Sequence, residues 1–265
     1  MKLNTITIPS FDENHQPKPN LTLIHGWAAE SRVWEGWAKE KFSAEYTITL
    51  IDLPGFGDSE DIEKSPQLMD NWIKALVDVM PQQTHLLGWS LGGLLAQQIA
   101  LRYPLRVQSL ICLATTPRFT QNDGWQRSVS PQIISDFIQA MSIEVSGVLK
   151  KFWRLQLQGA ENARALMKEL GKHMANRTVP TFNALNQGLI LLIEMDNRQQ
   201  LHELKIPTLW LLGENDPLIP QEIRSNLHDL QPNAQIEVIP GGSHIPFFSQ
   251  PDETADYILN FLRQH

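Results

Sequence analysis

Short runs of apolar residues alternate along this chain with longer segments of helical periodicity. The apolar runs predict strands at residues 21–24, 46–51, 84–87, 107–113, 208–212 and 236–239, with a weaker antiparallel strand within residues 3–8. Helical patterns lie between them, notably at residues 68–80, 91–103 and 252–263. Strands and helices in alternation are typical of a mainly parallel central sheet flanked by helices, so we expect an α/β fold.

One stretch breaks this alternation. Between residues 117 and 185 there is no convincing strand pattern, and helices are expected at residues 131–141, 142–158 and 161–174, with another starting near 181. In a doubly wound sheet, an insertion after a strand lies above the strand ends, where ligands bind. We therefore predict a core made of residues 1–116 and 186–265 and an all-helical lid made of residues 117–185.

Composition narrows the class of protein further. The 265 residues are 42% hydrophobic and 19% charged, which predicts a packed core, and the net charge of −7 argues against a nucleic-acid partner. The single cysteine, Cys112, allows no internal disulfide and no cysteine cluster for a metal. We see no signal peptide and no apolar run of about 18 residues. We expect a cytoplasmic monomer with no cofactor, no metal and no contact with membranes.

The strongest chemical signal is Gly-Trp-Ser-Leu-Gly at residues 88–92, with Ser90 at its centre. It fits the pattern G-x-S-x-G, and it follows a predicted strand and opens a predicted helix. The two glycines permit a sharp turn that exposes the serine hydroxyl at the positive end of the helix. A chance match to five residues is common, but this strand–turn–helix context predicts that Ser90 is a nucleophile.

A serine that transfers acyl groups needs an oxyanion hole, a pair of N–H donors for the negative oxygen of its intermediate. One donor is expected at the backbone of Leu91, directly after the nucleophile, and the second in a loop after an earlier strand. His25-Gly26-Trp27 follows the strand at residues 21–24, so we assign the second donor to the Trp27 N–H. We interpret His25 itself as a structural turn residue.

The general base is expected late in the chain, because the order of the three groups is serine, acid, histidine. Of eight histidines, His244 lies in the loop after the last predicted strand, from which it can reach over the sheet. The acid belongs in the loop after the preceding strand, where we choose Asp216 and keep Glu214 as the alternative. Asp52 also ends a strand, but it precedes the serine and is interpreted as a turn residue.

These motifs identify the resemblance. Residues 52–57 (Asp-Leu-Pro-Gly-Phe-Gly), 88–93 (Gly-Trp-Ser-Leu-Gly-Gly) and 213–216 (Gly-Glu-Asn-Asp) resemble the α/β-hydrolase superfamily. The strings at 25–27, 87–94 and 152–156 are similar to one family within it, the pimeloyl-[acyl-carrier protein] methyl ester esterases of biotin biosynthesis. The similarity runs over most of the chain, and it implies the α/β-hydrolase fold with a helical lid.

The resemblance also implies a reaction and a partner. The family's serine carboxylesterases remove a methyl ester from the pimeloyl chain on its acyl carrier protein and release methanol. By position, the residues that contact the acyl chain are Trp27, Leu91 and Phe152. Arginines on the family's lid meet the acidic carrier protein, and the matching positions here are Lys151, Arg164 and Lys168. A further family arginine falls at Gly147, so that contact is left open.

The charges of the lid agree with an acidic partner. Residues 118–180 carry nine Lys or Arg and five Asp or Glu, although the whole chain has a net charge of −7. A basic lid on an acidic body fits a docking surface, and the alternative is a solvated helix face. Helical spacing puts Lys151 with Arg154 on one helix face, and Arg164 with Lys168 on another. The sequence does not say whether the two faces meet, and we predict that all four residues form the carrier-protein surface.

Two alternatives stay open. The first is a hydrolase of the same fold that acts on another small substrate, as a general carboxylesterase, a thioesterase or a carbon–carbon bond hydrolase, since substrate choice lies in the lid. The second is a binding protein that uses the hydrolase pocket as a receptor. The presence of Ser90, Asp216 and His244 together argues against this second alternative.

Overall fold

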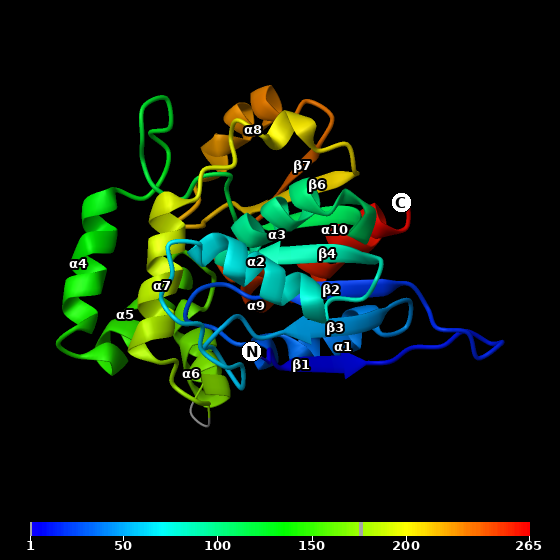
Figure 1. The fold of residues 1–265 in the computed structure, drawn as a ribbon, viewed down its shortest axis with the longest axis horizontal. Helices are drawn as coiled ribbons and strands as arrows, with labels where there is room; N and C mark the ends of the chain where they lie inside the picture. The colour runs from blue at the N-terminus through cyan, green and yellow to red at the C-terminus, as the bar shows by residue number, and fades with distance from the viewer. Residues whose placement is uncertain (1, 175–176) are drawn as a thin grey trace.

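The fold is built on one twisted sheet, seen across the middle of the computed structural model in Figure 1, which describes residues 2–174 and 177–265. Seven strands lie in the order β1-β3-β2-β4-β5-β6-β7, and only β1 is antiparallel to its neighbour. Their bounds are β1 (Thr5–Ile8), β2 (Asn20–Ile24), β3 (Thr47–Ile51), β4 (Thr84–Trp89), β5 (Val107–Leu113), β6 (Thr208–Gly213) and β7 (Gln235–Ile239). Every predicted strand is present, and the ends differ by at most two residues.

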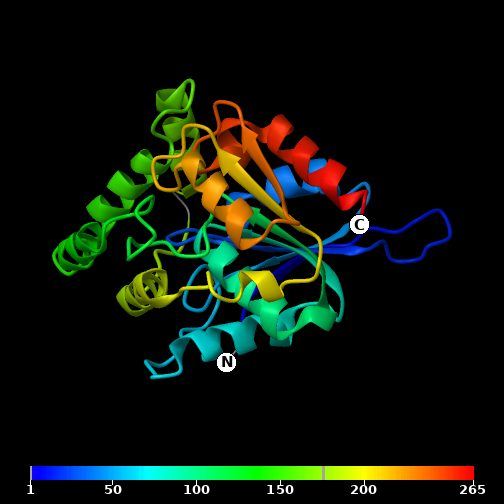
Figure 2. The same cartoon turned by 90° about the horizontal axis from the view of Figure 1, so that it is seen from above.

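Helices cover both faces of the sheet (Figure 2). One face carries α1 (Glu35–Phe42), α9 (Pro246–Ser249) and α10 (Pro251–Leu262), and the other carries α2 (Leu68–Val79), α3 (Leu91–Arg102) and α8 (Arg224–Leu230). Successive strand residues point to opposite faces, so Leu86 packs in one hydrophobic cluster and Leu87 in the other. Burial on both sides explains why these strands read as continuous apolar runs.

The chain order places a ligand crevice at a defined point of the sheet. From β2 the chain adds β3 on one side, and it then crosses to add β4 on the other side of β2. In open α/β sheets, ligands bind at such a switch point, outside the carboxyl ends of the strands. The loops that follow β2 and β4 begin at His25 and Ser90, so the fold brings the two predicted oxyanion segments to one crevice.

In the predicted lid, residues 117–130 form a loop with isolated β-bridges, and the regular elements of the described part that follow are helices. Between β5 and β6 lie α4 (Pro131–Met141), α5 (Val145–Gln156), α6 (Ala163–Met174) and α7 (Phe182–Glu194), grouped at the left end of the sheet in Figures 1 and 2. Side chains cap three of these helices: the Gln132, Gly147 and Ala184 amides donate to Ser130, Glu144 and Thr181, respectively. The Glu144 cap makes α5 begin at Val145, later than the predicted start at residue 142. The boundary predicted after residue 185 falls inside α7.

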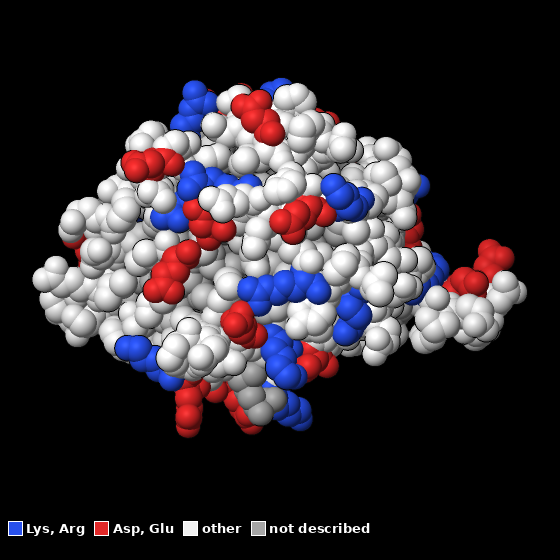
Figure 3. Space-filling view, turned by 45° about the horizontal axis from the view of Figure 1, so that its top comes forward, with Lys and Arg blue, Asp and Glu red and all other residues white. Residues whose placement is uncertain are grey.

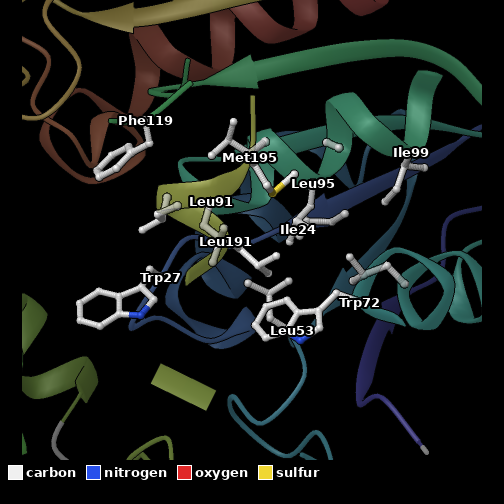
Figure 4. Close-up of a cluster of buried hydrophobic side chains, with 14 of the residues drawn as sticks. Ile24, Trp27, Leu53, Trp72, Leu91, Leu95, Ile99, Phe119, Leu191 and Met195 are labelled. Carbon is white, nitrogen blue, oxygen red and sulfur yellow. The ribbon is translucent and has the colours of Figure 1, made fainter. Parts of the chain in front are cut away.

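Lid and core share one hydrophobic interior. Figure 4 shows Trp27, from the loop after β2, and Leu91, the first residue of α3, beside Leu191 of α7, with Phe119 of the lid nearby. The α4 side of the molecule carries little charge in Figure 3, whereas Lys and Arg alternate with Asp and Glu elsewhere on that face. Within residues 2–174 and 177–265, no helix has both the length and the apolar character that a membrane span requires.

Candidate active site

Ser90 lies in the tight turn between β4 and α3. Its backbone has φ of 54° and ψ of −118°, a strained conformation for a residue with a side chain. The turn is possible because Gly88 and Gly92 lack a Cβ. A Cβ on Gly92 would overlap the backbone oxygen of Ile24 in β2, and one on Gly88 would overlap the Gly92 carbonyl. The glycines therefore let β4, α3 and β2 approach closely enough to hold Ser90 above the sheet.

Ser90, His244 and Asp216 form one chain of hydrogen bonds. His244 Nε2 lies 3.0 Å from Ser90 Oγ, and His244 Nδ1 lies 2.8 Å from Asp216 Oδ2. A carboxylate only accepts, so Nδ1 carries the proton and Nε2 presents its lone pair to the serine hydroxyl. All three residues are buried, with 5%, 0% and 6% exposure, respectively.

Backbone contacts hold the histidine and the acid in place. The Trp89 indole donates to the His244 carbonyl at 2.8 Å, and the His244 amide donates to the Gln156 carbonyl of α5 at 3.1 Å. Asp216 Oδ1 accepts from the amides of Leu218 and Ile219 at 2.8 and 3.0 Å. Because these bonds occupy Oδ1, Oδ2 faces the imidazole. The orientation of the Asp216 carboxylate relative to the His244 ring is therefore fixed.

The alternative acid, Glu214, lies elsewhere. Its Oε2 accepts the Gly241 amide at 2.7 Å, a contact that stabilises the loop after β7. Asp52 is buried and accepts from Ser31 N, Asp58 N and Asn4 Nδ2, as expected for a residue that organises turns. Neither carboxylate is hydrogen-bonded to His244.

His25 is fully buried and also has a structural place. Its Nε2 accepts the Leu53 amide at 3.0 Å, so Nδ1 carries the proton and donates to the Gly26 carbonyl at 2.8 Å. Burial lowers the pKa of His25, which keeps the ring neutral in this role. The residue thereby fixes the start of the loop that contains Trp27.

The two predicted oxyanion donors are brought to the same crevice. A Cβ built on Gly26 would lie 3.0 Å from Ser90 Cβ, which shows how closely the loop after β2 approaches the serine. Leu91 is the first residue of α3, so its N–H has no acceptor within the helix. Within the described residues, neither the Leu91 nor the Trp27 backbone N–H has a hydrogen-bond acceptor.

An apolar cavity adjoins Trp27 under the lid. It measures about 30 Å³, and all of its lining residues are apolar, Trp27, Phe137, Phe152 and Leu155 among them. The Trp27 ring meets Phe152 edge-on with centroids 4.8 Å apart, and its indole N–H donates to the Leu185 carbonyl at 2.9 Å. Trp27 and Phe152 are therefore brought together as predicted substrate contacts, and Leu91 packs in the same cluster.

The predicted carrier-protein residues separate into two places. Lys151, Arg154 and Arg164 line one open groove of about 680 Å³ between α5 and α6, with Leu155 and Met167 in its wall. Lys168 lines a different depression on α6, together with Lys172 and Glu169. Leu155 lies in the wall of both the groove and the apolar cavity, so the two are neighbours on either side of this residue.

Several residues of the site were not predicted from the sequence. Gln156 supports His244 through its carbonyl oxygen, which any residue type offers, so no sequence signal exists for it. Phe137 joins the apolar cavity, and Trp153 and Arg177 contact the loop after β2. Phe137 lies on the apolar side of a predicted helix, which is the one available signal. In the described part of the chain, no group of three or more His, Cys, Asp or Glu is arranged to hold a metal.

Comparison with known proteins defines the class first. The family model described as the alpha/beta hydrolase fold matches residues 19–251, and the chain belongs to this family. Solved structures agree on the fold: an esterase from Exiguobacterium antarcticum has a TM-score of 0.83 at 20% identity, covering 98% of this chain and 95% of that one. MenH from S. aureus has a TM-score of 0.79 at 21% identity, with 98% of each chain covered.

Relatives with higher identity carry one name. The pimeloyl-[acyl-carrier protein] methyl ester esterase of Aeromonas salmonicida is 36% identical over 244 residues, covering 92% of this chain and 95% of that protein. The esterase of the same name from Aliivibrio fischeri is 33% identical over 260 residues, covering 98% of this chain and 100% of the relative. Within the α/β hydrolases, this chain is therefore grouped with carboxylic ester hydrolases.

Proposed function

We propose that the chain is a serine carboxylesterase that hydrolyses the methyl ester of pimeloyl-[acyl-carrier protein] to pimeloyl-[acyl-carrier protein] and methanol. The observation that carries the reaction class is the buried hydrogen-bond chain from Asp216 through His244 to Ser90. The names of the relatives carry the choice of substrate, because they match over more than nine-tenths of the chain.

In the first half of the reaction, Ser90 Oγ attacks the carbonyl carbon of the methyl ester while its proton passes to His244 Nε2. The carbonyl oxygen becomes negative, and the N–H groups of Trp27 and Leu91 donate to it. The tetrahedral intermediate then collapses, the bond to the methoxy oxygen breaks, and His244 protonates that oxygen to give methanol. Asp216 orients the ring and stabilises the imidazolium.

In the second half, water attacks the acyl group on Ser90, and His244 takes the proton from the water. The second intermediate uses the same two N–H donors, collapses, and releases the carboxyl end of the pimeloyl chain as the acid. His244 returns the proton to Ser90 Oγ, which restores the free enzyme.

The geometry supports a substrate that extends from Ser90 out to a macromolecule. The apolar cavity beside Trp27 and Phe152 and the groove between α5 and α6 lie on either side of Leu155. An acyl chain fits the apolar part, and the cations Lys151, Arg154 and Arg164 suit an acidic carrier protein at the outer end. Lys168, on the other depression of α6, supports the proposal less directly.

The small size of the cavity also limits the state in which substrate enters. A volume of about 30 Å³ holds roughly two water molecules, much less than a seven-carbon chain needs. We propose that residues 117–185 act as a lid that opens to admit the chain. We also propose a monomer in the cytoplasm, where a reducing environment suits the one buried, free cysteine, Cys112.

The decisive experiment compares two substrates of the purified protein. Pimeloyl-[acyl-carrier protein] methyl ester should lose its methyl group, detected as methanol and as the mass of the acylated carrier, with a kcat/KM well above that of free dimethyl pimelate. Equal turnover of the two esters would favour a general carboxylesterase. Absence of turnover on both, together with no labelling of Ser90 by a fluorophosphonate, would favour a binding protein.

The Ser90→Ala variant is the matched control for that experiment. Loss of the nucleophile should lower kcat by about 10³ to 10⁶ while the protein stays folded. Any residual activity would come from the oxyanion donors and from substrate binding, which the substitution leaves in place. Circular dichroism checks the fold. Turnover close to that of the unchanged protein would contradict the assignment of Ser90.

A further inference from the structure

The segment after β2, residues 26–31, is named here the oxyanion loop because it contains Trp27. Its two ends are tied to the core. At the start, His25 donates to the Gly26 carbonyl and accepts from Leu53, and at the end the Ser31 amide donates to Asp52 at 2.6 Å. Both anchoring groups belong to the sheet and its turns.

The middle of the oxyanion loop is held by the lid. The Trp153 indole of α5 donates to the Ala28 carbonyl at 3.3 Å, and the Trp27 indole donates to Leu185 of α7 at 2.9 Å. Arg177, between α6 and α7, places Nε 3.1 Å from Glu30 Oε1. This last contact is an ion pair without hydrogen-bond alignment, and both side chains are largely buried.

The loop gives itself little support. Ala28 has φ of 60°, in the left-handed region that residues with a Cβ rarely adopt. The turn hydrogen bond around it, from the Ala29 amide to the Gly26 carbonyl, is long at 3.4 Å. A strained conformation persists only where its surroundings impose it, and the lid contributes to these surroundings through Trp153 at Ala28 and Arg177 at Glu30.

We propose that Trp153 and Arg177 are positioning residues that hold the oxyanion loop so that the Trp27 N–H points at the reacting carbonyl. The inference rests on the proposed function, in which that N–H is an oxyanion donor. With the lid opening proposed above for substrate entry, the oxyanion hole is complete only once the lid has closed again. Hydrolysis is thereby coupled to closure of the lid over the bound acyl chain.

The first test replaces the indole donor and keeps an aromatic ring. Trp153→Phe should lower kcat on a short p-nitrophenyl ester about tenfold, below the 10²–10³ that full removal of an oxyanion donor costs, with KM changed less than about twofold. The matched control is Trp37→Phe, since the Trp37 indole also donates to a backbone carbonyl, that of Pro251, which is not part of the oxyanion loop. The control should retain the kcat of the unchanged protein.

A second readout separates positioning from general loss of structure. A trifluoromethyl ketone adds to the serine and places a negative oxygen in the hole, so its Ki should rise in Trp153→Phe by the same factor as kcat/KM falls. If Trp153 had only a structural role, Trp153→Phe would lower the melting temperature, and Ki would not rise by the same factor as kcat/KM falls. The double variant Glu30→Gln with Arg177→Met removes both charges together, so it leaves no isolated buried ion, and it should lower kcat in the same way.

The outcomes distinguish the two proposals. If the unchanged protein has no esterase activity, the proposed function fails and this inference falls with it. If it is active and depends on Ser90, but Trp153→Phe and Trp37→Phe have kcat values within twofold of each other, only the positioning role is overturned. A loss of kcat in Trp153→Phe with an unchanged Ki for the ketone would also overturn it.

Discussion

Two carboxylates that are two residues apart, Glu214 and Asp216, have different roles for a geometric reason. The Asp216 side chain turns inward onto His244, whereas Glu214 turns out onto the Gly241 amide. Asp216→Asn should lower kcat by about 10⁴, because an amide facing Nδ1 favours the wrong tautomer of the ring. Glu214→Gln should lower it little. Steady-state kinetics on a p-nitrophenyl ester measure both, and a larger loss in Glu214→Gln would make Glu214 the acid.

Asp52 offers a prediction about stability and pH. Burial alone would raise the pKa of Asp52, but nearby His25 and the hydrogen bonds from Asn4 and Ser31 outweigh burial and hold it below the ordinary value. A lowered pKa in the folded state means that the ionised form stabilises the fold above the ordinary value of 3.8. This stabilisation is lost as the pH falls through the folded-state pKa.

Asp52→Asn should therefore destabilise the protein at pH 7 by about 1–3 kcal/mol, since the amide group would face backbone donors that it cannot satisfy. The difference in melting temperature from the unchanged protein should shrink as the pH is lowered below about 4. Thermal unfolding followed between pH 7 and pH 3 measures it. A difference that stays constant over that range would contradict the charged role of Asp52.

At the scale of elements, strand positions followed from sequence because burial on both faces leaves a plain apolar run. Most helix ends also followed within two residues, and the exception is the start of α5, which depends on a single cap, Glu144. The boundary of the predicted lid at residue 185 fell inside α7 for a related reason. The amphipathic pattern of α7 continues unbroken as the helix passes from the lid to the core, so the pattern contains no boundary.

The packing of α7 on the oxyanion loop depends on Gly188. A Cβ on Gly188 would lie 2.6 Å from Cδ1 of the Trp27 ring, which is itself enclosed. Alanine is the better helix former by about 0.5–1 kcal/mol, yet Gly188→Ala should lower both the melting temperature and kcat because the ring must move. Gly171→Ala in α6, where a Cβ meets nothing within 4 Å, should instead stabilise the protein. Equal stabilisation in both variants would show that Trp27 adjusts freely.

The groove between α5 and α6 separates the lid cations into two sets, which allows a specific prediction for carrier binding. Lys151→Glu with Arg164→Glu reverses two charges in one groove, and should raise KM for the carrier-bound ester while leaving a short p-nitrophenyl ester unaffected. Lys168→Glu with Lys172→Glu makes the same change of charge in the other depression on α6, and should raise KM for the carrier-bound ester less. Added salt should weaken only the carrier reaction, because exposed charges are screened. If both double variants raised KM equally, the change would reflect the overall charge of the protein rather than the groove between α5 and α6.

At the scale of the whole molecule, the site is a joint product of core and lid. The core supplies Ser90, His244 and Asp216, while the lid supplies Phe152 and the carbonyl of Gln156 that supports His244. On the face drawn in Figure 3, positive and negative side chains are interspersed rather than gathered by sign, so the proposed recognition of an acidic carrier would depend on the local groove rather than on the overall field. Loss of lid contacts is therefore expected to affect chemistry as well as substrate choice.

The sequence by itself determined the order of strands and helices, the turn that contains Ser90, and the loops that contain Trp27, Asp216 and His244. These features depend on local patterns, because glycines, strand burial and helix periodicity act over a few residues. The resemblance to the carrier-protein esterases supplied the substrate, which no local pattern encodes.

Only the tertiary structure decided which side chains meet. It placed Asp216 rather than Glu214 against His244, separated Lys168 from Lys151 and Arg164, and set Trp153 against Ala28, 125 residues earlier in the chain. The same holds for the contact between Ser90 and His244, across 154 residues. The physical reason is that such contacts depend on how helices pack and how loops turn over the sheet, and these depend on the whole interior rather than on the spacing of residues within one element.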